Sequence, residues 1–196
     1  PLDADAQKGM ALFYGAAGCS TCHAGAFQTD HGFHAMGAPQ LGPGKAAVFE
    51  THTRDTGRMG VTGNGADAYA FRTPSLRNVM QTGPWGHAGG HSQIEKFLRD
   101  HMDPARAAKR FAPGAADRNG VRLPPLDGDD WREMDDPAAR DAITQAAMIR
   151  APKGLNPGDI AALVSFLRSL DDPQALSGRL GIPDTVPSGL AVGGAP

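Results

Sequence analysis

The sequence predicts an all-α fold with long irregular loops. Three segments, residues 3–14, 92–103 and 156–170, carry apolar residues at the spacing of one helix face. The chain holds 26 Gly and 16 Pro among its 196 residues, and this composition favours turns and irregular backbone. Aromatic residues make up only 6% of the chain, so such a domain would gain from a large cofactor around which to pack.

Charge and hydropathy argue against two classes of partner. The formal net charge is −2 at pH 7 and the pI is about 6.4, which argues against broad electrostatic binding of nucleic acid. The longest apolar runs, such as residues 160–167, are too short to cross a bilayer. No signal peptide begins the chain, and residues 1–9 resemble a mature terminus or a cut end; this leaves the compartment open.

The first predicted helix spans residues 3–14 and leads directly into the most informative motif of the chain. Gly15 and Gly18 end it. Its apolar positions recur at turn spacing: Ala6, Met10 and Phe13 or Tyr14.

The only two cysteines of the chain, Cys19 and Cys22, are followed at once by His23. A redox disulfide is one interpretation, but no strand–helix–strand pattern surrounds the pair. Half of a zinc site is another, but the chain has no second cysteine pair. Cys-x-x-Cys-His is the signature of covalent c-type haem attachment: the two thiols bond to one edge of the porphyrin, and the histidine supplies the proximal imidazole. The motif therefore predicts a cytochrome c-like domain around one covalently bound haem c.

Residues 25–70 are predicted to form long ordered loops, because they are rich in Gly, His and Thr and show little periodicity. Loops of this length in a compact domain are typical of cofactor-wrapping segments. His31, His34 and His52 lie here, and we expect them to neighbour solvent or the haem propionates and not to bind iron.

Two arginines are candidates for binding the haem carboxylates. Arg77 lies within residues 75–80, which are predicted to form a short helix, and Arg72 lies before them. A planar guanidinium suits a buried carboxylate. The alternative is that both are solvated surface residues.

A helix with a histidine on its apolar face is predicted between Ser92 and Asp103. Ser92 and Glu95 have the spacing of a capping box, and Asp103 precedes a proline. At about 100° per residue, His101 falls near the centre of the apolar face and Met102 near its edge. His101 is thus the predicted sixth iron ligand, with Met102 as the alternative. The apolar face consists of Ile94, Phe97 and Leu98.

Two further helices are expected near the end of the chain. One begins at Pro137, and another is capped by Asn156. The latter buries one face: Ile160, Leu163, Val164, Leu167 and Leu170. We predict a haem domain over residues 1–173 and an extended C-terminal tail over residues 174–196.

With these segments identified, the chain resembles the C-terminal haem domain of the bacterial di-haem cytochrome c peroxidase and MauG family. The likeness covers most of residues 5–173, and Cys19, Cys22 and His23 look like the attachment site of that haem. The string "FRTPSLRNV", with a histidine about ten residues on, is fairly specific to the family. The matching strings are "AGCSTCHAG", "FQTDHGFHAMGAP", "DTGRMGVTG", "FRTPSLRNVMQTGPWGHAGG", "IEKFLRDHMDP" and "LNPGDIAALVSFLRSLDDP".

The resemblance implies roles for further residues. Peroxidases of the family place Met at the distal position, and MauG-like members place Tyr. Counted from His87, that position falls on His101 and not on Met102, which implies a bis-histidine haem with a lower reduction potential than a His/Met haem. Family members also hold calcium between their domains through backbone carbonyls, which here would be those of Thr82 and Pro84.

The chain departs from the family in holding a single Cys-x-x-Cys-His motif. Peroxide chemistry in the family takes place at a second haem, so we expect an electron-transfer domain that works with a second haem domain or subunit and a redox protein partner. The alternative is a stand-alone monohaem electron carrier without catalysis. A third hypothesis is that His101 leaves the iron on reduction and opens a catalytic site. Covalent haem attachment predicts the periplasm.

Overall fold

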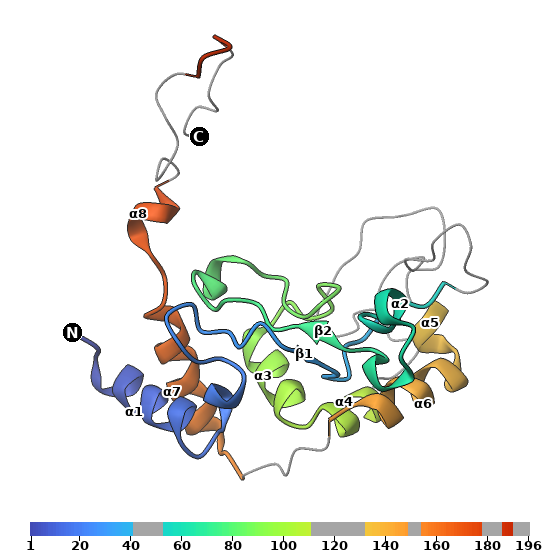
Figure 1. The fold of residues 1–196 in the computed structure, drawn as a ribbon. Coiled ribbons are helices and arrows are strands. Elements are labelled where there is room, and N and C mark those ends of the chain that lie inside the picture. Colours follow the sequence, from blue (N-terminus) through green and yellow to red (C-terminus); the bar gives the residue numbers. More distant parts are fainter. Residues whose placement is uncertain (41–52, 111–131, 149–153, 178–185, 190–196) are drawn as a thin grey trace.

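Two helices from opposite ends of the sequence pack against each other in the computed structural model (Figure 1). α1 (Ala4–Tyr14) begins at Asp3, whose carboxylate accepts a hydrogen bond from the Ala6 backbone N–H at 2.7 Å, and it ends at Gly15 as predicted. The structure describes residues 1–40, 53–110, 132–148, 154–177 and 186–189.

α7 (Pro157–Arg168) has the cap that its sequence predicts. The side chain of Asn156 accepts from the Asp159 backbone N–H at 3.0 Å, and the Asp159 carboxylate accepts from the Asn156 backbone N–H at 3.1 Å. This capping box satisfies two backbone donors at the start of the helix. The buried residues of α7 are Ile160, Ala162, Leu163, Val164, Phe166 and Leu167.

The main hydrophobic core lies between α1 and α7. Phe13 of α1 is 2% exposed, and its ring centre lies 5.1 Å from that of Phe166. Partly buried side chains from the motif and from the His101 helix pack on the same core, including Cys19, Leu98 and Met102. We call this cluster the α1–α7 core: Phe13, Ala17, Leu76, Ile160, Leu163, Phe166 and Leu167.

The remaining elements are short. The other helices of the described residues are α2 (Met59–Thr62), α3 (Ile94–Met102), α4 (Pro104–Arg110), α5 (Arg132–Asp135), α6 (Pro137–Ala146) and α8 (Pro173–Leu176). The same residues form the 3₁₀ turns η1 (Cys19–Thr21), η2 (Gly65–Asp67) and η3 (Val79–Gln81). The predicted all-α class is confirmed, with long irregular stretches between the helices.

A short two-stranded sheet in the loop region was not predicted from the sequence. β1 (Phe33–His34) and β2 (Phe71–Arg72) pair antiparallel, with Phe33 opposite Arg72 and His34 opposite Phe71. They form the only sheet among the described residues. Two-residue strands are too short to show an alternating pattern, so periodicity could not reveal them.

A second, smaller core lies at the other end of the molecule, where α4 packs on α6. Ala108 of α4, Met134 of α5 and Ile143 of α6 are each at most 1% exposed, and Tyr69 packs with them. Tyr69 comes from the loop before β2, so this second core fixes part of the long loop region.

Two predictions of local structure were wrong. The Ser92–Glu95 capping box does not form: α3 begins at Ile94 with Gln93 at the N-cap and no side-chain cap. Backbone hydrogen bonds in both directions join His91 to Trp85 at 2.7 and 3.1 Å, and this pairing delays the start of the helix. The predicted short helix at residues 75–80 is only the 3₁₀ turn η3.

The boundary of the predicted tail stays a prediction. α8 begins at Pro173 and lies at the start of that segment, while residues 178–185 and 190–196 fall outside the described residues. None of the helices in the described ranges is long and apolar enough to cross a membrane.

Replacing Gly9 by alanine should destabilise the fold. A Cβ at this position would collide with the carbonyl oxygen of Ala162 and lie 2.8 Å from Phe166 Cβ. The higher helix propensity of alanine gains at most about 1 kcal/mol, whereas overpacking typically costs about 1–3 kcal/mol, and here the obstacle is backbone. We expect a net loss of about 1–2 kcal/mol in the free energy of unfolding, measured by urea titration with circular dichroism.

Gly65→Ala is the matched control, because a Cβ there would meet no atom within 4 Å. Equal stability changes in the two variants would contradict the close helix contact.

Candidate functional site

The motif is held in a tight turn directly after α1. Gly18 adopts a left-handed conformation, with φ of 65°, and starts η1. The carbonyl of Cys19 accepts hydrogen bonds from the backbone N–H groups of Cys22 (3.3 Å) and His23 (3.0 Å). Both cysteines are half-buried, so each thiol has a route to a ligand at the surface of the α1–α7 core.

His23 is oriented by the loop that follows it. Its Nδ1 lies 3.2 Å from the carbonyl oxygen of Gln28. A carbonyl only accepts, so we assign the proton to Nδ1, and Nε2 is then the nitrogen that carries the lone pair with which an imidazole binds a metal. The backbone N–H of Asp30 donates to the carbonyl of Cys22 at 2.8 Å and holds this loop against the motif.

His101 lies opposite His23. Their ring centres are 6.3 Å apart and the ring planes are inclined by 44°. A metal bonded to one nitrogen of each ring would hold the centres roughly 6 Å apart, since a metal–imidazole bond is about 2 Å long and a ring nitrogen lies about 1 Å from the ring centre. The two histidines therefore have the spacing that a six-coordinate haem iron requires.

Met102, the alternative ligand, occupies a different environment. Its side chain packs on the α1–α7 core together with Leu98 and Cys19. A methionine in this place fills apolar space on that core. His101 instead contacts aromatic rings: its ring centre lies 5.0 Å from that of Phe97.

Sequence reasoning missed His91. It is 3% exposed, its Nε2 lies 3.1 Å from Asp100 Oδ2, and its ring packs edge-on to Phe97 at 5.4 Å. The position carries no signal in the sequence beyond being the second of two histidines shortly before α3, because the glycine-rich segment around it shows no periodicity.

The two arginines predicted to bind haem carboxylates make other contacts. Arg72 lies 2.7 Å from His31 Nδ1, and its side chain is exposed. Arg77 forms an ion pair with Asp172 at 2.6 Å. This hydrogen bond from Arg77 lowers the pKa of Asp172. Binding of haem carboxylates by either arginine stays a prediction.

The predicted calcium ligands lie in the turn before Trp85. The hydroxyl of Thr82 donates to the carbonyl of Val79 at 3.1 Å, and the Trp85 indole N–H donates to the same carbonyl at 2.8 Å. Pro84 follows a cis peptide bond. A calcium site built from the Thr82 and Pro84 carbonyls stays a prediction, and so does the role of His52, which lies outside the described residues.

A second donor set involves one motif cysteine. Ligand atoms of Cys22, Asp30 and His34 lie within 4.8 Å of one another. A zinc site needs further ligands beside the two cysteines, and the sequence holds no second cysteine pair. In the fold, a carboxylate and an imidazole approach Cys22, and haem attachment would compete for the same thiol.

Asp30 is strongly acidic. Burial acts to raise its pKa, but hydrogen bonds from His34 (2.8 Å), from the Gly32 backbone N–H (2.8 Å) and from Thr73, with the charge of His34, outweigh it. The pKa of Asp30 therefore falls from its ordinary 3.8 to about 2. Asp30 is ionised at neutral pH and places a negative charge beside the motif.

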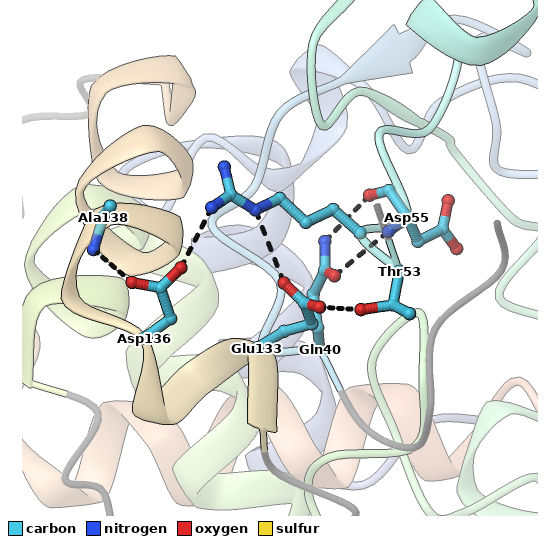
Figure 2. A network of polar contacts seen from close by, with 7 residues as sticks. Gln40, Thr53, Asp55, Glu133, Asp136 and Ala138 are labelled. Atoms are coloured by element: carbon cyan, nitrogen blue, oxygen red, sulfur yellow. Dashed lines mark hydrogen bonds and ion pairs between the residues drawn. The ribbon is translucent and has the colours of Figure 1, made fainter. Parts of the chain in front are cut away.

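A polar network joins the long loop to the second core (Figure 2). Arg54 forms ion pairs with Glu133 (3.4 Å) and Asp136 (2.9 Å), and Thr53 hydrogen-bonds to Glu133. Two hydrogen bonds also join Gln40 to the backbone of Asp55, at 2.8 and 3.0 Å.

The same loop reaches the turn before α3. Asp55 Oδ2 lies 2.8 Å from His87 Nε2, and the His87 ring stacks on Phe71 with centres 3.6 Å apart. The network thus connects α5 and α6 to the segment that leads into the His101 helix.

Comparison with known proteins finds relatives among cytochrome c peroxidases and MauG proteins. The chain is 30% identical over 183 residues to the cytochrome-c peroxidase IdrP1 of Denitromonas iodatirespirans, which covers 84% of this chain and 46% of that protein. It is 41% identical over 103 residues to the methylamine utilization protein MauG of Methylorubrum extorquens, covering 51% of this chain and 25% of that protein. The chain is related to the cytochrome c peroxidase and MauG family.

Solved structures agree on the fold. A MauG-like protein associated with microbial copper homeostasis superposes with a TM-score of 0.57 at 21% identity, over 91% of this chain and 47% of the other. The diheme peroxidase BthA of Burkholderia thailandensis also has a TM-score of 0.57, at 20% identity, over 90% of this chain and 45% of the other. No family model matches the chain. The chain spans less than half the length of these relatives. The resemblance to the family predicted from the sequence is confirmed.

The acidity of Asp30 gives a prediction about stability. Its depressed pKa contributes stability that is present above about pH 4 and is lost as the pH falls through about 2. We expect Asp30→Asn to lower the free energy of unfolding at pH 6 by on the order of 1 kcal/mol, after allowance for partial solvent screening. At pH 3 the deficit should be roughly half as large.

Urea unfolding of both forms at the two pH values measures this. Asp141→Asn, on the exposed face of α6, is the control, because Asp141 makes no hydrogen bond or ion pair with another described residue. A deficit that grows toward low pH would contradict the assignment.

Proposed function

We propose that the chain is the haem c electron-transfer domain of a di-haem cytochrome c peroxidase or MauG-type oxidoreductase. The observation that carries this is the pair of facing histidines, His23 of the Cys-x-x-Cys-His motif and His101 of α3, at 6.3 Å. The relatives support it, since they include cytochrome c peroxidases, MauG and diheme peroxidases.

Each residue of the motif has a separate task. Cys19 and Cys22 would bond the porphyrin edge, and His23 would bind the iron with Nε2. The bound haem supplies one-electron redox chemistry. The Gln28 carbonyl keeps the proton of His23 on Nδ1, and this hydrogen bond makes the imidazole a stronger ligand.

The second ligand decides between electron transfer and peroxide chemistry. If His23 and His101 both held the haem iron, no ligand position would be left open for peroxide. Such a haem can exchange electrons but is not itself the peroxide-reactive centre. We therefore propose that it relays electrons to or from a peroxide-reactive haem on a second haem domain or subunit, with a redox protein as the other partner, in the periplasm.

A stand-alone monohaem carrier is the second candidate. The presence of one Cys-x-x-Cys-His motif in the 196 residues favours it. Mixing the reduced domain with a separately prepared peroxide-reactive haem protein of the family distinguishes the two. Electron transfer that depends on this partner supports the relay, whereas unselective transfer to any acceptor supports the carrier.

The ligand set gives a direct test. The chain expressed with a haem c maturation system should retain one haem through denaturing electrophoresis, and the double variant Cys19→Ser, Cys22→Ser should lose it. The oxidised protein should give a low-spin bis-imidazole signal by low-temperature EPR. His101→Ala should abolish that signal, and Met102→Leu should leave it unchanged.

The opposite result reassigns the ligand. A low-spin signal of the histidine–methionine type that is lost in Met102→Leu and survives in His101→Ala would make Met102 the distal ligand. A near-infrared charge-transfer band typical of methionine-bound ferric haem would support that reassignment.

A further inference from the structure

The side chain of His91 is buried beside α3. Only 3% of the residue is exposed. Two backbone hydrogen bonds to Trp85 fix its main chain, and its Nε2 is 3.1 Å from Asp100 Oδ2. Because a carboxylate oxygen only accepts, Nε2 carries the proton and donates a hydrogen bond to Asp100.

Asp100 receives a second donor from another helix. The Nη2 atom of Arg110, the last residue of α4, lies 3.1 Å from Asp100 Oδ1. One carboxylate in the last turns of α3 is therefore held from two directions, by the turn before the helix and by the helix after it. Hydrogen bonds to a charged group are roughly twice as strong as neutral ones.

Asp100 directly precedes the two candidate iron ligands. His101 and Met102 are neighbours on the helix, so their side chains leave it about 100° apart. The His101 ring contacts His23 and Phe97, whereas Met102 packs on the α1–α7 core. A rotation of this turn by about one residue would exchange the two side chains.

We propose that His91 and Arg110, through Asp100, are positioning residues that select His101 over Met102 as the ligand opposite His23. This inference rests on the proposed haem site. Holding Asp100 fixes the rotation of the last turn of α3, and that rotation decides which side chain points at the metal. The selected ligand in turn sets the reduction potential, because a methionine ligand raises it.

The chemistry of His91 argues against a purely space-filling role. Its Nδ1 is buried and has no hydrogen-bond partner among the described residues. A buried polar atom without a partner costs stability that an apolar side chain of similar size would avoid. The hydrogen bond to Asp100 is the only side-chain contact of His91 with the described residues that an apolar side chain could not replace.

The ligand population of the oxidised, haem-loaded chain tests this. Low-temperature EPR and near-infrared magnetic circular dichroism would be recorded for the wild type, His91→Leu, Asp100→Asn and Arg110→Gln. We expect one bis-imidazole form in the wild type. The ratio of methionine-bound to histidine-bound haem should rise roughly tenfold or more in His91→Leu and Asp100→Asn, and less in Arg110→Gln. The reduction potential should rise with it.

Arg110→Gln keeps the test sound if the buried variants fold poorly, because the Arg110 side chain is about half exposed and its loss opens no cavity. His87→Gln is the matched control: it removes a histidine–aspartate contact from the same turn, but with Asp55 as the partner in place of Asp100. It should leave the ligand population unchanged.

The outcomes separate the two proposals. A wild type that retains no haem overturns the proposed function, and this inference with it. A haem-loaded wild type with methionine as its sole distal ligand overturns the selection of His101. Bis-imidazole spectra that are identical in the wild type and all three variants overturn the positioning role alone.

Discussion

The close contact between α1 and α7 is the constraint on which the candidate site depends. The two helices meet at Gly9, where the backbone of Ala162 leaves no room for a side chain, and the resulting core buries Phe13 and Phe166. The motif turn follows α1 directly, and α3 packs on α7. Cys19 and Met102 both pack against this core. The contact between α1 and α7 therefore brings the motif and α3 to the same apolar surface.

The helices and the motif could be predicted because their signals are local. Asn156 caps its helix as expected, and Gly15 ends the first one. His101 could be singled out from the sequence, because a histidine on an apolar helix face is informative once a haem motif is present, and its ring lies opposite that of His23. Its role as a ligand stays a prediction. These features need only a few neighbouring residues to specify them.

The features that escaped prediction depend on contacts between distant segments. His91 joins α3 to the turn at Trp85, and the start of α3 shifted from Ser92 to Ile94 for the same reason. Asp30 and His34 approach Cys22 only after the loop folds back on the motif. No periodicity or spacing encodes such pairings, because the backbone between them is irregular.

Polar contacts take the place of a large core in the loop region. Arg54 forms ion pairs with Glu133 and Asp136. Burial acts to lower the pKa of Arg54, but the interactions with Tyr69 and Asp136 outweigh it, so the pKa is raised. Partly buried ion pairs of this kind contribute little to the net free energy of folding. They favour one arrangement of the loop, because other arrangements would leave the charged groups unpaired.

A single arrangement of the chain matters for the proposed electron-transfer haem. The reduction potential depends on the distal ligand, and in this chain the two candidate ligands are adjacent residues of one helix. A fold held only by apolar contacts could tolerate a rotated α3, since His101 and Met102 both have apolar bodies. Directional contacts at Asp100, from His91 and from Arg110, restrict that rotation. The polar groups around α3 thus link the turn before the helix to the choice of ligand in the proposed haem site.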